Sequence, residues 1–151
     1  MNAGGVDKAC KSNGQMSDFR RQMSDDIIKI MDVTNLRVYL KALELLPQVY
    51  ELARQLPKSE PRLRSQLCNS AKAISAQIAE GFAKKESQKE FKRFLLMALG
   101  SSDETVTHLR QIELLRFANV DLNLCGLLMG EYVSESKQIN TLVQKIKNNY
   151  L

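Results

Sequence analysis

The chain has 151 residues, 44% of them hydrophobic and 26% charged, which is ordinary for one globular domain. Three prolines and seven glycines leave little room for the many turns of an all-β fold. No apolar run reaches the roughly 18 residues of a membrane span, and no signal-peptide core precedes Lys11. Cys10, Cys68 and Cys125 are odd in number and widely spaced, which argues against a disulfide framework and favours a cytoplasmic protein.

Positive charge is concentrated in the middle of the sequence. The net charge of the chain is +5, and the segment from Arg54 to Arg93 contains ten basic and four acidic residues. This segment therefore carries +6, and the rest of the chain sums to −1. The positive field is expected to come from the body of the protein rather than from a tail.

The hydrophobic pattern predicts a weakly structured extension over residues 1–32 and helices over residues 33–151. Within the extension, Ser24 to Asp26 is expected to cap at most one helical turn. The first long helix is predicted from Thr34 to Leu56, kinked at Pro47. Its apolar residues form two adjacent stripes, namely Leu36, Tyr39, Leu43, Leu46, Tyr50 and Ala53, and Ala42, Leu45, Val49, Leu52 and Leu56. Two stripes exceed what one bundle buries, so the protein is predicted not to be a monomer.

Three more helices follow in the predicted pattern. The second begins at Pro61, with Gly81 at its end or in its last turn, and the third runs from Gln88 to about Phe117. Ser87 and Glu90 have the spacing of a capping box at the start of the third helix. Gly100 in its middle suggests a close helix crossing. The fourth helix runs from about Leu122 to Asn148, with a polar middle, residues 131–138, expected to face solvent. Long helices with short turns predict an antiparallel up-down four-helix bundle.

The residues that usually carry chemistry are isolated in this sequence. His108 is the only histidine, and Cys68 and Cys125 lack the spacing of a zinc site. Glu80 lies in an apolar run without a partner acid, so a structural role is favoured over a catalytic one. We therefore expect no catalytic residue, metal or cofactor, and a protein that is not an enzyme.

The basic connector, defined as residues 84–93, follows the apolar run around Glu80. It has two interpretations. It is either a solvated helix start or a surface for phosphate groups. Basic residues at a helix N-terminus oppose the helix dipole, which modestly favours a binding role. Phe91 and Phe94 fall on the core stripe, so the lysines are expected to be free to face water and base stacking is not indicated.

Several segments together resemble a known bacterial family. These are Asn35 to Leu45, Leu56 to Glu60, Ile78 to Phe82, and Ala98 to Ser102 with Glu104. They are similar to a four-helix-bundle family that includes proteins encoded in intervening sequences of large-subunit ribosomal RNA genes. Gln77, where the family usually has asparagine, and Pro47 depart from the pattern.

The resemblance implies an up-down bundle that assembles into a homo-oligomeric ring, commonly a pentamer. The related accessory proteins of diversity-generating retroelements are similar basic rings that bind nucleic acid and a reverse transcriptase. The residues for which the resemblance implies a structural or assembly role are Glu80, Gly81, Phe82, Gly100, Ser101 and Glu104.

These observations lead to two functional hypotheses. The first is a non-enzymatic oligomeric bundle that binds RNA or DNA backbones through Arg62, Arg64, Lys84, Lys85, Lys89, Lys92 and Arg93. The alternative is a protein-interaction scaffold that docks a partner such as a reverse transcriptase. Salt-dependent binding to generic nucleic acid favours the first, and salt-resistant binding to one protein favours the second.

Overall fold

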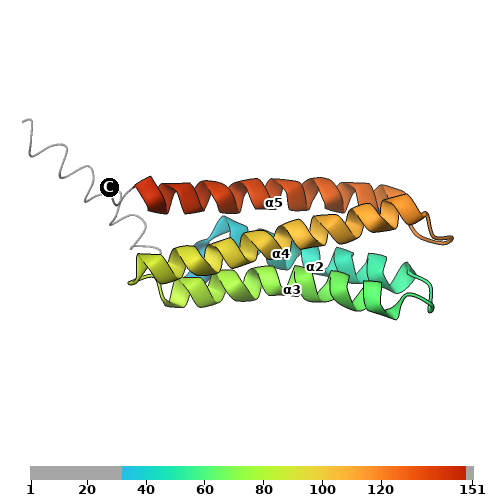
Figure 1. The fold of residues 1–151 in the computed structure, drawn as a ribbon, viewed down its shortest axis with the longest axis horizontal. Helices are drawn as coiled ribbons and strands as arrows, with labels where there is room; N and C mark the ends of the chain where they lie inside the picture. The colour runs from blue at the N-terminus through green and yellow to red at the C-terminus, as the bar shows by residue number, and fades with distance from the viewer. Residues whose placement is uncertain (1–31, 149–151) are drawn as a thin grey trace, which may run out of the picture. The chain divides into compact units, whose positions relative to one another are not determined.

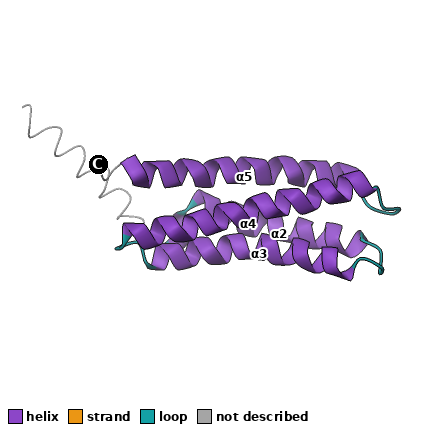
Figure 2. Ribbon diagram, viewed as in Figure 1, coloured by secondary structure: helices purple, strands orange, loops and turns teal. Residues whose placement is uncertain are grey.

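A computed structural model describes residues 32–148, which form a bundle of four long helices (Figure 1). The elements are a 3-10 turn η1 (Val33–Asn35) and the helices α2 (Arg37–Gln55), α3 (Pro61–Ala83), α4 (Gln88–Leu115) and α5 (Leu122–Asn148). Successive helices run antiparallel, and the described residues contain no strand (Figure 2). The predicted all-α four-helix fold is confirmed. None of the described helices is long and apolar enough to cross a membrane.

The chain enters the bundle through a separate capped turn. The Oδ1 atom of Asp32 accepts a hydrogen bond from the N–H of Thr34 at 2.9 Å, and η1 precedes α2. The helix predicted from Thr34 therefore begins at Arg37 instead. It continues as one helix through Pro47, whose exposed ring removes one backbone donor. The rest of the predicted extension, including the turn after Ser24, lies outside the described residues.

The inward-facing apolar residues of α3 and α4 recur at helical spacing and are buried, with one exception. Leu99 is only half-buried. The buried members are Leu63, Leu67, Ala71, Ile74, Ile78 and Phe82 on α3, and Phe91, Phe94, Leu95, Ala98, Val106, Leu109 and Ile112 on α4. Cys68 and Cys125 are free thiols in the same core, and the Sγ–H of Cys125 donates to the carbonyl of Leu109.

The two glycines singled out in the sequence have different surroundings. Gly81 lies in the last turn of α3, where an added Cβ would come within 2.7 Å of the Cβ of Phe94. The close approach of α3 and α4 therefore requires glycine there. Gly100 is exposed, and apart from its chain neighbours and the nearby backbone of α4, no described atom lies within 4 Å of an added Cβ. The crossing predicted at Gly100 is wrong for a single bundle, because this position faces outward.

Hydroxyl groups link α4 to its neighbours near the middle of the bundle. Ser101 donates to the side-chain oxygen of Gln77 at 2.8 Å, and Thr105 donates to the hydroxyl of Ser70 at 2.9 Å. On the other side, Ser102 donates to the carbonyl of Tyr132 at 3.2 Å. Ser101 thus has a structural role within one chain, at the contact between α3 and α4.

The middle of α5 differs from the prediction. Residues 131–138 were expected to face solvent, yet the side chains of Tyr132 and Glu135 are fully buried. Their positions explain this, because Leu128, Tyr132, Glu135 and Ile139 recur at steps of four, three and four. The buried stripe therefore continues through the polar stretch. The prediction was wrong because it relied on the polar composition of this stretch and not on the helical spacing of its positions.

Only one of the two apolar stripes of α2 is fully covered by the bundle, because the other is buried at its ends, at Leu36 and Ala53, and open between them. The second stripe, from Ala42 to Leu56, is buried throughout. On the other stripe Leu43 and Tyr50 are 40% and 41% exposed, and the neighbouring Leu40 is 47% exposed. We call Leu40, Leu43, Leu46, Pro47 and Tyr50 the outer face of α2. It leaves an apolar surface open on the single chain.

Candidate nucleic-acid interface

Backbone hydrogen bonds and one side-chain cap hold the basic connector between α3 and α4. The N–H groups of Lys84 and Lys85 donate to the carbonyls of Gly81 and Phe82 at 3.0 and 3.1 Å. The hydroxyl of Ser87 accepts from the N–H of Glu90 at 3.4 Å, which confirms the predicted cap. The second half of the capping box does not form, because the N–H of Ser87 donates to the carbonyl of Lys84 instead.

The connector rests on buried aromatic rings. Phe82 and Phe91 meet edge to face, with their centroids 6.3 Å apart, and Phe94 is also buried. The ammonium of Lys84 and the guanidinium of Arg93 each lie 4.6 Å from the centroid of Phe94. The ammonium of Lys85 lies 4.4 Å from that of Phe82.

These cation–π contacts modify the expectation from the sequence. The core position of Phe91 and Phe94 is confirmed, and Lys84 and Arg93 are exposed as expected. These two cations and the half-buried Lys85 also contact the rings. Each such contact at an exposed site contributes about 0.5–1 kcal/mol. The aromatic rings therefore hold these cations close to the surface of the connector and limit how freely they move.

The connector cations also differ in their ion-pair partners. Arg93 binds both carboxylate oxygens of Glu90, at 3.3 and 3.0 Å, and this hydrogen bonding lowers the pKa of Glu90. Lys89 is exposed and Lys92 half-buried, and neither has an ion-pair partner in the described part of the chain. Lys89 and Lys92 are therefore the connector cations most available to an outside ligand.

Two predicted contact residues lie away from the connector. Arg62 and Arg64 belong to the first turn of α3, roughly 30 Å from Lys84 at 1.5 Å per helical residue. The guanidinium of Arg64 donates to the carbonyls of Ala53 and Leu56, at 3.1 and 2.7 Å. The carbonyl of Ala53 also accepts from the N–H of Leu56 at 3.2 Å, so Arg64 adds a second donor there and provides a donor for the carbonyl of Leu56. The structure brings five of the seven predicted residues together and leaves these two at the opposite end.

The connector end also contains basic residues that the sequence analysis did not select. Arg37 begins α2 and Lys145 lies near the end of α5, and both are exposed. In this antiparallel bundle, the start of α2 and the end of α5 lie at the same end as the turn between α3 and α4 (Figure 1). The predicted topology was sufficient to identify them, since it fixes which helix ends meet.

The other residues considered for chemistry are accounted for separately. Glu80 is exposed and forms no ion pair with a described residue. His108 is buried, with Nε2 3.3 Å from Oε1 of Glu104 and Nδ1 3.1 Å from Oε1 of Gln111. Glu104 lies four residues before His108, a spacing that places both side chains on one face of α4 and that identifies this partner from the sequence. Within residues 32–148, no three His, Cys, Asp or Glu side chains gather into a metal-binding group.

Comparison with known proteins gives one family match. The chain matches the family model described as 23S rRNA-intervening sequence protein over residues 34–146. A search of curated proteins gives no match. The matched range includes α2, α3 and α4 and nearly all of α5. The chain therefore belongs to the 23S rRNA-intervening sequence protein family.

Proposed function

We propose that this protein is a cytoplasmic, non-enzymatic homo-oligomer, forming a ring such as a pentamer, that binds the phosphate backbone of RNA or DNA at its connector end. The observation that carries the proposal is the arrangement of Lys84, Lys85, Lys89, Lys92 and Arg93 around one turn. The exposed residues Arg37 and Lys145 extend this positive surface.

The contact chemistry fits a phosphate backbone better than exposed bases. The rings of Phe82, Phe91 and Phe94 are buried beneath the cations, so they offer no open face for base stacking. Lysine and arginine heads held above them present charge and N–H donors to phosphate oxygens. Binding of this kind depends on salt and little on sequence.

The outer face of α2 supports the assembled state. Contiguous exposed apolar residues on a soluble protein mark interaction surfaces, and Leu40, Leu43 and Tyr50 lie on one such surface. In an assembly, each copy would repeat the connector. Weak contacts of single connectors with one nucleic-acid chain would then add through multivalency.

Charge reversal at the connector tests the proposal. Lys89→Glu with Lys92→Glu removes the two connector cations that have neither an ion-pair partner nor a cation–π contact among the described residues, and leaves the cation–π contacts in place. Lys58→Glu with Arg62→Glu makes the same change in net charge at the opposite end of the bundle, where both residues are exposed. We expect affinity for a generic RNA or DNA duplex to fall at least tenfold in the connector variant and much less in the control. Equal losses in both variants would contradict a connector site.

A second candidate function is a scaffold for a partner protein such as a reverse transcriptase. The observation that favours it is apolar exposure beyond the outer face of α2, at Leu96 and Met97 on α4, at Leu114 and Leu115 at its end, and at Leu127 on α5. Binding to such a surface would be apolar and therefore resistant to salt. Tight binding to one protein that survives high salt, without binding to nucleic acid, would favour this function.

A further inference from the structure

A carboxyl group lies in the middle of the bundle without a polar partner. The side chain of Glu135 has no exposed surface, and neither carboxyl oxygen has a hydrogen-bond partner among the described residues. The hydroxyl of the neighbouring Tyr132 is also buried and unpaired within this part of the chain. An ionised carboxylate in such a place is costly, so the carboxyl is held neutral. Burial raises the pKa of Glu135 to about 8, and Lys41 offsets part of this effect.

One cation faces Glu135 from the packed helices. From α2, the ammonium of Lys41 acts on Glu135 through space, with the carboxylate of Glu44 beside it. From α3, the thiol of Cys68 lies near Tyr132, and its charge state affects that hydroxyl. From α4, the carboxylate of Asp103 accepts a hydrogen bond from Ser136, the residue after Glu135.

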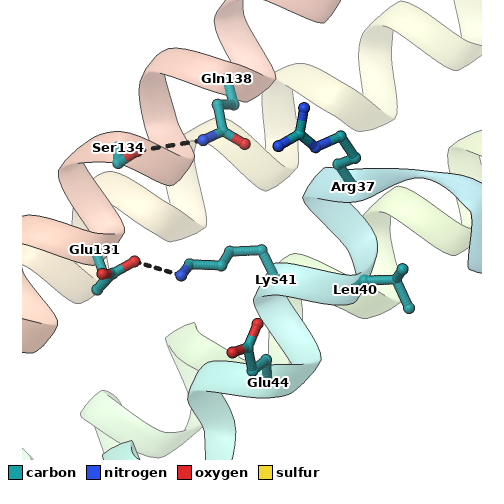
Figure 3. Close-up of a pocket in the computed structure, with 7 residues that line it drawn as sticks. All are labelled: Arg37, Leu40, Lys41, Glu44, Glu131, Ser134 and Gln138. Atoms are coloured by element: carbon teal, nitrogen blue, oxygen red, sulfur yellow. Dashed lines mark hydrogen bonds and ion pairs between the residues drawn. The ribbon is translucent and has the colours of Figure 1, made fainter.

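The cation that could neutralise Glu135 is engaged elsewhere. Lys41 binds the carboxylate of Glu131 on α5 at 2.5 Å, and this hydrogen bond raises the pKa of Lys41. Figure 3 shows this pair crossing from α2 to α5, with Glu44 on the α2 side of Lys41. Ionisation of Glu135 would therefore set two carboxylates in competition for one ammonium.

The contact between α2 and α5 is the least extensive of the four contacts between neighbouring helices. A groove of roughly 320 Å³ follows it, lined by Arg37, Leu40, Lys41, Glu44, Glu131, Ser134 and Gln138. Leu40 points away from the polar side chains of this groove (Figure 3). No loop joins α2 to α5, whereas the other neighbouring pairs are joined by short turns. These two helices can separate without strain on a connecting segment.

We propose that Glu135 and the Lys41–Glu131 ion pair form a proton-controlled latch between α2 and α5. With Glu135 protonated, the latch is closed as in the structure. Loss of the proton leaves a buried negative charge, which is relieved when α5 moves away from α2 and the carboxylate reaches water. Since α2 also presents the outer apolar face, the latch links the proton concentration to the helix that we expect to mediate assembly.

Hydrogen exchange of the full-length protein, followed from pH 5.5 to 9.5, tests the latch. If opening ionises Glu135, the opening equilibrium constant rises about tenfold per pH unit until the pH reaches the pKa in the closed state, and then levels off. We expect α2 and α5 amides, corrected for intrinsic exchange rates, to lose protection in this way. The exchange of these amides should also depend less on added denaturant than the exchange of α3 and α4 amides, because a local opening exposes less surface than global unfolding.

Two variants separate the latch from other causes. Glu135→Gln keeps the shape and cannot ionise, so the dependence of α2 and α5 protection on pH should disappear. Glu131→Gln frees Lys41 to stabilise an ionised Glu135, so the levelling-off should move to lower pH. A pH dependence that persists in Glu135→Gln would overturn the proposal. Wild-type exchange with the same protection and denaturant dependence in all four helices would also overturn it. If Glu135→Gln does not fold, the proposal is overturned by a Glu131→Gln protein whose levelling-off stays at the pH of the wild type.

Discussion

At the scale of single residues, burial changes the chemistry of Glu135 more than its sequence neighbours do. The residue lies in a polar stretch of α5, where composition alone predicts a solvated carboxylate with an ordinary pKa. Its place in the step pattern from Leu128 to Ile139 puts it in the core instead. The helical spacing of apolar residues predicts which side of a helix a residue occupies. Its electrostatic surroundings depend on the side chains of the helices that pack against that side.

The stability of the bundle should fall as the pH rises toward the pKa of Glu135. The unfolded carboxyl has a pKa of 4.5 and the folded one a pKa of about 8, so the folded state holds the proton more tightly. The stabilisation from this bound proton is fully present below pH 4.5. It falls by about 1.4 kcal/mol per pH unit between pH 4.5 and pH 8, and it is lost above pH 8. Urea unfolding at a series of pH values measures it. Glu135→Gln should flatten the plot of unfolding free energy against pH. An equally steep plot in that variant would show that another group causes the pH dependence.

The two glycines of α3 and α4 provide a paired test of packing. Gly81→Ala should lower the free energy of unfolding by about 1–3 kcal/mol, because the new Cβ clashes with the Cβ of Phe94. Gly100→Ala should raise it by up to about 1 kcal/mol, since alanine favours the helix and this position is open. Denaturant titration of both variants checks the difference. A stabilised Gly81→Ala protein would show that α3 and α4 are not in close contact there.

At the scale of helices, the sequence was sufficient to predict most of the fold. The starts of α3, α4 and α5 agree with the predicted ones, because Pro61 and Ser87 are local signals and Leu122 follows a short polar turn. Which apolar stripe of α2 turns inward could not be predicted, since both have the helical period. The choice depends on α3 and α5, which cover the stripe containing Ala42 and Leu45.

The uncovered stripe of α2 leads to a prediction about assembly. In sedimentation at micromolar concentration, we expect the wild-type protein to have several times the mass of one chain. Leu43→Glu should shift it toward the monomer, because a charge would be buried in the interface, while the fold stays nearly intact. Leu114→Glu, at an exposed position at the end of α4, is the control and should leave the mass unchanged. A wild-type protein that sediments as a monomer would exclude the ring.

At the scale of the whole bundle, the two ends differ in how their charges are used. At the end with Arg62, the guanidinium of Arg64 caps α2 and Arg54 pairs with Glu51. At the connector end, Lys89 and Lys92 have no such partner within the described residues. The sequence grouped all these cations in one central segment, and it could not show that a full helix length separates them. Only the topology divides them into a structural set and the set that we propose to bind phosphate groups.

The salt dependence of nucleic-acid binding tests the central claim most directly. The logarithm of the association constant for a generic duplex, measured against the logarithm of salt concentration, should fall linearly for the wild-type protein. For Lys89→Glu with Lys92→Glu, the slope should become shallower by roughly 0.7–0.9 for each phosphate group that the variant no longer binds. The matched variant Lys58→Glu with Arg62→Glu should keep a slope close to that of the wild type. A connector variant that binds with an unchanged slope would contradict the account and show that the connector is only a solvated surface.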